Sequence, residues 1–176
     1  MMSSFGRGVE GPAQNCDIYL TLGAYTLPAL EDLLQTAPVL RESALLQQLV
    51  QRSRPIGLLK LALSHSIALS LLQRLKEEGA EGYLVPVAYQ HPRITVEQAT
   101  LIAERYFETV KATERPDDTL GPTHFRGEDP MYWIFEATSE QLLKEDRIPG
   151  VLFAHVDKLD GHIWGKEELM HLREGI

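Results

Sequence analysis

The chain has 176 residues, a formal net charge of −8 and a single cysteine, Cys16. This charge argues against binding nucleic acid, which normally requires a basic face that displaces counterions, and one cysteine excludes an intramolecular disulfide. No apolar stretch approaches the ~18 residues that cross a bilayer. We therefore expect a cytoplasmic protein with neither a nucleic-acid nor a membrane partner.

The acidic residues are concentrated in the second half of the chain. Residues 1–90 hold seven Lys and Arg against eight Asp and Glu, a net charge of −1, whereas residues 91–176 hold ten against seventeen, a net charge of −7. Such an excess favours a cationic partner by electrostatic steering. It is also typical of a solvated surface that keeps a protein soluble.

The first half predicts a β-α-α-β-α-β order after a Gly-rich, polar and flexible tail over residues 1–15. Alternating apolar residues predict a strand over 16–23, and leucine-rich segments predict helices over 26–38 and 39–53. A strand over 54–63 is weakened by Gly57. The helix over 64–80 is capped by Ser64 and stops at Gly79. Its predicted buried stripe comprises Ile67, Ala68, Leu71, Leu72 and Leu75. A strand over 81–89 is confined by Pro86 to an edge or to its own end.

Residues 90–93, "QHPR", are expected to link this half to a second unit. Thr95 and Gln98 form a capping box before a helix over 94–113. A long polar loop over 114–130 follows, and loops of this length are often functional. We expect a strand over 131–139, a short helix or irregular crossing over 140–150 and a strand over 151–158. After a turn, residues 162–172 leave as a strand that turns into a final helix.

These patterns predict an α+β protein of two small units. Residues 16–90 would form an α/β sandwich, and residues 94–173 would form a helix packed on a three-stranded antiparallel sheet. No internal repeat relates the two halves.

Residues 56–87 resemble the C-terminal module of ribosomal protein L7/L12 and the ClpS adaptor. In that module a Leu-Ser pair opens a helix that ends near Gly-Ala-Glu and is followed by a strand. The matching residues here are Leu63, Ser64, Gly79, Ala80, Glu81 and Val85. The lysine-rich surface of the ribosomal version is missing, since the helix holds only Arg74 and Lys76. The resemblance therefore implies the fold of this module without its ribosomal role.

Residues 94–164 resemble the small helix-plus-sheet units of the PepSY and Imm35 (YrhB-like) families. There an Ile-Thr-x-x-x-Ala-x-x-x-Ala helix packs on a meandering sheet, closed by Val-Asp-x-x-x-Gly-x-Ile. The matching residues here are Ile94, Thr95, Ala99, Ala103, Val156, Asp157, Gly161 and Ile163. Members of these families are mostly binding or inhibitory modules, and Imm35 proteins are regarded as toxin antidotes. The resemblance thus implies a binding role.

The segment "HVDKLDGHIWG", residues 155–165, contains the densest group of metal-ligating side chains. His155 and Asp157 should face the same side of a strand, and His162 could oppose Asp157 across a hairpin. This trio is a plausible metal site. The alternative is purely structural, because Asp160-Gly161 is a strong type I′ turn signal and Asp157 could bind the turn backbone.

Aromatic residues concentrate on the strands of the second unit. Alternation places Trp133 and Phe135 on one face and Tyr132 and Ile134 on the other. Most should be core, but a helix on one face would leave some exposed. The resulting hypothesis is a partner surface with acidic neighbours, made of Trp133, Phe135, Glu136, Asp157, Asp160 and Trp164.

No nucleotide-binding, zinc-protease or CxxC motif occurs, so we expect no enzyme activity and no cofactor. The favoured function is binding of another protein, as an immunity or antitoxin-type inhibitor of a partner with a basic surface. The alternatives are an adaptor or accessory subunit of a larger assembly, and a metal-assisted hydrolase that uses His155, Asp157 and His162.

Overall fold

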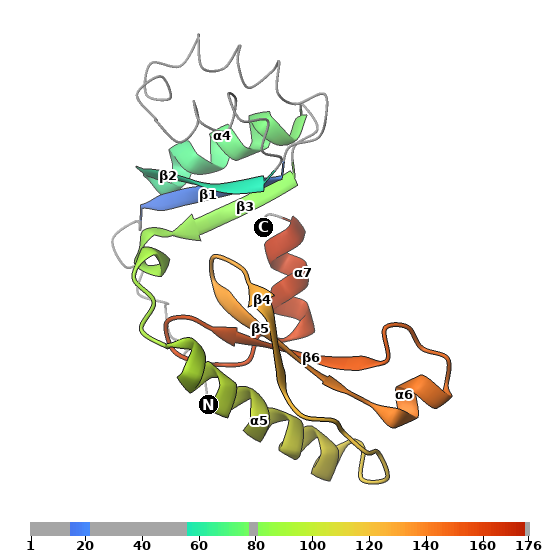
Figure 1. The fold of residues 1–176 in the computed structure, drawn as a ribbon. Coiled ribbons are helices and arrows are strands. Elements are labelled where there is room, and N and C mark those ends of the chain that lie inside the picture. The colour runs from blue at the N-terminus through green and yellow to red at the C-terminus, as the bar shows by residue number, and fades with distance from the viewer. Residues whose placement is uncertain (1–14, 22–55, 78–80, 175–176) are drawn as a thin grey trace, which may run out of the picture. The chain divides into compact units, whose positions relative to one another are not determined.

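The computed structural model describes residues 15–21, 56–77 and 81–174, and the chain divides into two compact units, residues 1–87 and 88–176. Helices and two antiparallel sheets, each with three strands among the described residues, confirm the α+β class (Figure 1). Within these ranges no helix has both the length and the apolarity to cross a membrane. The predicted tail, apart from Asn15, and the predicted helices over 26–38 and 39–53 lie outside the described residues.

The sheet of the first unit has the strand order β2-β1-β3. Strand β1 (Cys16–Thr21) pairs antiparallel with β2 (Ile56–Leu63) on one side and with β3 (Glu81–Pro86) on the other. Helix α4 (His65–Glu77) connects β2 to β3 and contacts both β3 and β1. The two outer strands are therefore parallel to each other, with β1 between them.

The buried face of α4 is narrower than predicted. Ala68, Leu72 and Leu75 are buried, but Ile67 is 57% exposed, so the expectation that Ile67 belongs to the buried stripe is wrong. One residue advances a helix by about 100°. Ile67 is displaced by that angle from Ala68 and consequently lies beside the packed stripe.

The predicted strand over 81–89 ends at Pro86, and a 3₁₀ helix, η1 (Val87–Gln90), follows it. Proline has no N–H with which to extend the ladder. The strand ends at Pro86, one of the two positions that the sequence allowed for this proline, and β3 is also an outer strand among the described ones. The expected linker over 90–93 is bound at its end to the second unit. Arg93 and Ile94 both donate their backbone N–H groups to the carbonyl oxygen of Lys158, at 2.9 and 3.0 Å.

Helix α5 (Val96–Thr113) begins the second unit's main hydrophobic layer, and its Thr95–Gln98 capping box is confirmed. The sheet has the order β4-β5-β6, formed by β4 (His124–Glu128), β5 (Tyr132–Thr138) and β6 (Val151–Asp157). A short helix, α6 (Glu140–Lys144), joins β5 to β6, and α7 (Lys166–Glu174) follows β6.

Two strands of this sheet, β5 and β6, are those that the sequence predicts, and the third differs. Strand β4 lies inside the segment assigned to a polar loop over 114–130. The strand predicted at the start of 162–172 does not form, because only Ile163 makes a bridge, to Val156. The final helix predicted in the same segment is confirmed as α7. The acidic first turn of α7, with Glu167 and Glu168, favours a helix start at this point.

Helix α5 lies across one face of this sheet (Figure 1). Small residues at the contact, Ala99 and Ala103 on the helix and Ala137 and Ala154 on the strands, let the layers approach closely, and Phe135 fills the space between them. This layer holds the start of α5 and the turn after β6 in place. Both flank the residues considered next.

Candidate functional site

Asp157, the last residue of β6, organises the turn after that strand. Its side chain is buried, and its Oδ1 accepts hydrogen bonds from the backbone N–H groups of Leu159 and Asp160 at 2.7 and 3.1 Å. Its Oδ2 accepts one from the Tyr89 hydroxyl at 2.6 Å and one from Nε1 of Trp164 at 2.9 Å. Four donors thus saturate a carboxylate that would otherwise be costly to bury.

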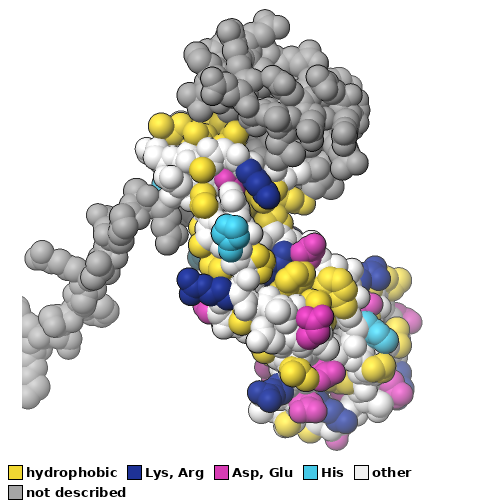
Figure 2. Space-filling view, turned by 60° about the vertical axis from the view of Figure 1, so that its left-hand side comes forward, with side chains coloured by type: hydrophobic (Ala, Val, Ile, Leu, Met, Phe, Trp, Pro, Cys, Tyr) yellow, Lys and Arg dark blue, Asp and Glu magenta, His cyan; other side chains and the backbone are white. Residues whose placement is uncertain are grey.

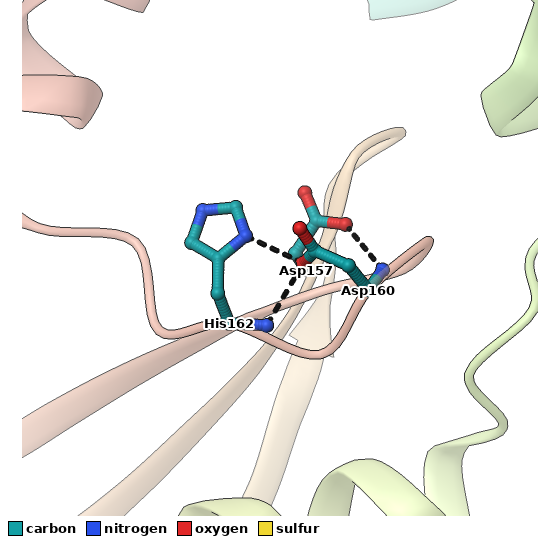
Figure 3. A group of neighbouring side chains, drawn as sticks. All are labelled: Asp157, Asp160 and His162. Atoms are coloured by element: carbon teal, nitrogen blue, oxygen red, sulfur yellow. Dashed lines mark hydrogen bonds and ion pairs between the residues drawn. The ribbon is translucent and has the colours of Figure 1, made fainter.

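His162 connects this turn to α7. Its Nδ1 lies 2.5 Å from Oδ1 of Asp160, and its backbone N–H also binds Asp160 (Figure 3). Its Nε2 lies 3.0 Å from Oε1 of Glu168 in α7. Partial burial lowers the pKa of His162, but the hydrogen bonds and charges of the carboxylates outweigh burial, and the net pKa is raised. The two carboxylates thus favour the protonated imidazole, whose two nitrogens lie between them.

The predicted metal trio is corrected by the structure. Ligand atoms of Asp157, Asp160 and His162 lie within 4.8 Å of one another, so Asp160 takes the place predicted for His155. The His155 ring instead packs edge-on against Tyr132, with the ring centroids 5.0 Å apart. Burial, with a further contribution from the charge of Arg173, lowers the pKa of His155.

The Asp157–Asp160–His162 group has the donor chemistry of a metal site, but its ligand atoms already make hydrogen bonds within the protein. A cation there would have to displace hydrogen bonds on both oxygens of Asp157 or the contacts of both nitrogens of His162. The structural interpretation, a turn held by its own side chains, accounts for every one of these contacts. The turn is not of type I′, because Gly161 has φ +76° while Asp160 has no positive φ.

The six residues predicted to form one partner surface lie in different environments. Phe135 is fully buried under α5 and Asp157 is buried in the turn, so the expectation that these two are exposed is wrong. Trp133 shares the face of Phe135, as alternation predicts, and donates its Nε1–H to the carbonyl oxygen of Ile94 at 3.0 Å. Glu136 pairs with Arg126 at 3.7 Å, and Asp160 and Trp164 belong to the turn.

Sequence reasoning missed a groove between α5 and the loop that precedes β4. This α5 groove has a volume of about 410 Å³. Its lining consists of Glu104, Phe107, Glu108, Lys111, Leu120, Gly121, Pro122 and Thr123. The only advance signal was the length of the polar loop over 114–130. No pattern in that loop indicates which of its residues would meet the helix.

Asp118 anchors the loop wall of the α5 groove. Its buried carboxylate accepts hydrogen bonds from the Ser139 hydroxyl at 2.5 Å and from the Gln141 N–H at 3.0 Å, and Arg115 lies 3.5 Å away. Burial raises the pKa of Asp118, but these hydrogen bonds and the Arg115 charge outweigh burial and hold the pKa below its usual value. Asp118 is therefore charged and structural at neutral pH.

The acidic excess of the second unit does not form one continuous patch on the visible face. Figure 2 shows carboxylates scattered among cationic and hydrophobic side chains. Five of the cations in this unit are paired: Arg115, Arg126, Lys144, Arg147 and Lys158. On α5, by contrast, Glu97, Glu104 and Glu108 are exposed and form no ion pair within the described residues.

No family model matches the chain, and neither the curated proteins nor the solved structures include a significant match to it. The resemblances to the L7/L12, ClpS, PepSY and Imm35 modules therefore stay predictions.

Proposed function

We propose that this chain is a non-enzymatic protein-binding module, and that it inhibits a partner with a basic surface in the manner of immunity proteins and antitoxins. The observation that carries the proposal is the set of exposed carboxylates on α5, Glu97, Glu104 and Glu108, which have no cationic partner among the described residues. Unpaired surface carboxylates attract and orient a basic partner at little cost to the fold.

The best candidate for a reactive cluster supports the same proposal. Of the three acid–base groups in that cluster, Asp157 and His162 already hold the turn together through contacts on all their polar side-chain atoms, and Asp160 binds His162 through Oδ1. A general acid or base needs a free position within hydrogen-bond reach of its substrate. These two residues would have to abandon structural contacts to act in that way.

The test is capture on the immobilised full chain from a lysate of the source organism, washed at low and at high salt. We expect a basic protein that is retained at low salt, released at high salt and inhibited when the purified chain is added to its assay. A partner that keeps its activity in the complex would favour an adaptor role. Stoichiometric metal in the purified chain, with hydrolytic turnover lost in His162→Ala, would contradict the proposal.

A further inference from the structure

The lining of the α5 groove combines apolar and charged side chains. Phe107, which is 3% exposed, lines the groove together with the half-buried Leu120. Glu104 and Glu108 are exposed on the helix side, and neither makes an ion pair among the described residues. The groove thus offers a surface for a hydrocarbon chain next to two carboxylates.

We propose that the α5 groove receives an arginine side chain of the basic protein partner, an inference that rests on the proposed function. Glu104 and Glu108 are four residues apart on α5, so their Cβ atoms are about 5–6 Å apart on the same helix face. A guanidinium has five N–H donors in a flat fork that matches carboxylate pairs. Its aliphatic stem would cover Phe107 and Leu120, as long cationic side chains commonly do on apolar surfaces.

The charge of the groove selects a cation over an anion. Two carboxylates, Glu104 and Glu108, face one ammonium group, that of Lys111, one turn further along the helix. The net charge of the lining is therefore −1. Lys111 also lines the groove and would donate to a carbonyl oxygen of the partner backbone, which suits a peptide segment better than a free cation.

The loop wall is fixed before any partner arrives. Gly121 donates its N–H to the carbonyl oxygen of Thr138 at 2.8 Å, and Leu120 forms a bridge with Ser139. Asp118 ties the same loop to Ser139 and to the first turn of α6. Because the wall is held at the end of β5, little loop ordering opposes binding.

The test is a titration of the uniformly ¹⁵N-labelled full chain with an N-acetylated, C-amidated Gly-Arg-Gly peptide, followed by two-dimensional amide spectra. We expect saturable shifts at Phe107, Gly121 and Thr123 with millimolar peptide. The variant Glu104→Gln/Glu108→Gln should weaken binding at least about tenfold, because it removes both acceptors of the guanidinium charge. The matched control, Glu167→Gln/Glu174→Gln, removes two exposed carboxylates of α7 outside the groove lining and should bind within about twofold of the parent chain.

A peptide in which citrulline replaces arginine tests the role of the charge, because it keeps the shape and loses the cation. It should produce no saturable shift in the groove. Shifts scattered over other surface carboxylates, equal binding by the two double variants, or equal binding of the citrulline peptide would each overturn the inference.

The same variants separate this inference from the proposed function. If the captured partner binds Glu104→Gln/Glu108→Gln as tightly as the parent chain, the binding module stands and the groove is not its arginine site. If the peptide binds in the groove but no basic protein is captured, the arginine site stands and the proposed function fails.

Discussion

The hydroxyl of Tyr89 donates a 2.6 Å hydrogen bond to Oδ2 of Asp157, across 68 positions of the chain. This bond joins the 3₁₀ helix before α5 to the turn after β6. Burial, followed by the hydrogen bond and charge of Asp157, raises the pKa of Tyr89, so the hydroxyl stays a donor at neutral pH. Asp157 therefore connects the segment that precedes α5 to the turn that follows β6.

Replacing Asp157 should strongly destabilise the second unit. Asp157→Asn presents an NH₂ group to donors that need an acceptor, and we expect a loss of about 2–4 kcal/mol in the free energy of unfolding. Tyr89→Phe removes only one of the four hydrogen bonds and should cost about 1–2 kcal/mol. Both tryptophans of the chain, Trp133 and Trp164, lie in the second unit. Urea unfolding followed by tryptophan fluorescence therefore measures this unit, and equal costs for the two variants would contradict the assigned network.

Helix α5 was predictable from sequence because its evidence is local. The Thr95–Gln98 capping box and the apolar positions at helical spacing all lie within the helix or beside its start. Strand β4 was not predictable, because "HFRGE" is an edge strand in which four of five residues are exposed and a bulge interrupts the pairing. Such a strand lacks the alternation by which strands are recognised.

The hydrogen bonds of the buried residues Asp157 and Asp118 also divide into those that the local sequence predicts and those that depend on distant residues. That Asp157 would bind its own turn was predictable, since aspartate commonly accepts from the backbone two residues on. Its bond to Tyr89 and the bond between Ser139 and Asp118, which spans 21 positions, depend on tertiary packing. For that reason the α5 groove could not be derived from the loop sequence.

The contacts of His162 with Asp160 and Glu168 should make the stability of the second unit depend on pH. The pKa of His162 is raised above its usual 6.5 in the folded state. Its stabilisation is therefore fully present below pH 6.5 and is lost as the pH rises through the folded-state pKa. The side chain is 42% exposed, so the effect should stay below about 1 kcal/mol.

The measurement for His162 is the melting temperature of the parent chain and of His162→Gln across this pH range. We expect the two curves to differ most below pH 6.5 and to converge at higher pH. The comparison with the variant removes the opposite contribution of His155, whose pKa is lowered. A difference that grows with rising pH would contradict a protonated bridge to Asp160 and Glu168.

The loop wall of the α5 groove should lose the stabilisation that Asp118 provides when the solution becomes acidic. Its pKa is lowered from 3.8, so its stabilisation is present above that pH and is lost as the pH falls through the lower folded-state value. Asp118→Asn should therefore lower the hydrogen-exchange protection of the Gly121 and Gln141 amides at neutral pH, by about 1–3 kcal/mol. The neighbouring Asp117→Asn, at an exposed site, is the control and should leave both amides unchanged. Equal protection in the two variants would show that Asp118 does not anchor the loop.

Gly161 should be the least replaceable glycine of the turn after β6. Its φ of +76° is disfavoured for a β-branched residue, and an added Cβ would lie 2.9 Å from Cδ1 of Ile102. Gly161→Val should cost about 2 kcal/mol or more, from backbone strain and displacement of the Ile102 side chain. Gly165→Ala is the matched control, since its Cβ would approach only Oε2 of Glu168, at 3.7 Å.

Tryptophan-fluorescence melting of the two glycine variants decides this prediction. Gly161→Val should melt several degrees below the parent chain, at roughly 4–8 °C per kcal/mol for a unit of this size. Gly165→Ala should melt at the same temperature as the parent chain. Gly161→Asn should recover part of the loss, because asparagine tolerates the left-handed region better than valine does. An unchanged melting temperature in Gly161→Val would mean that the turn adopts another conformation, in which Asp157 and His162 could not make the contacts described above.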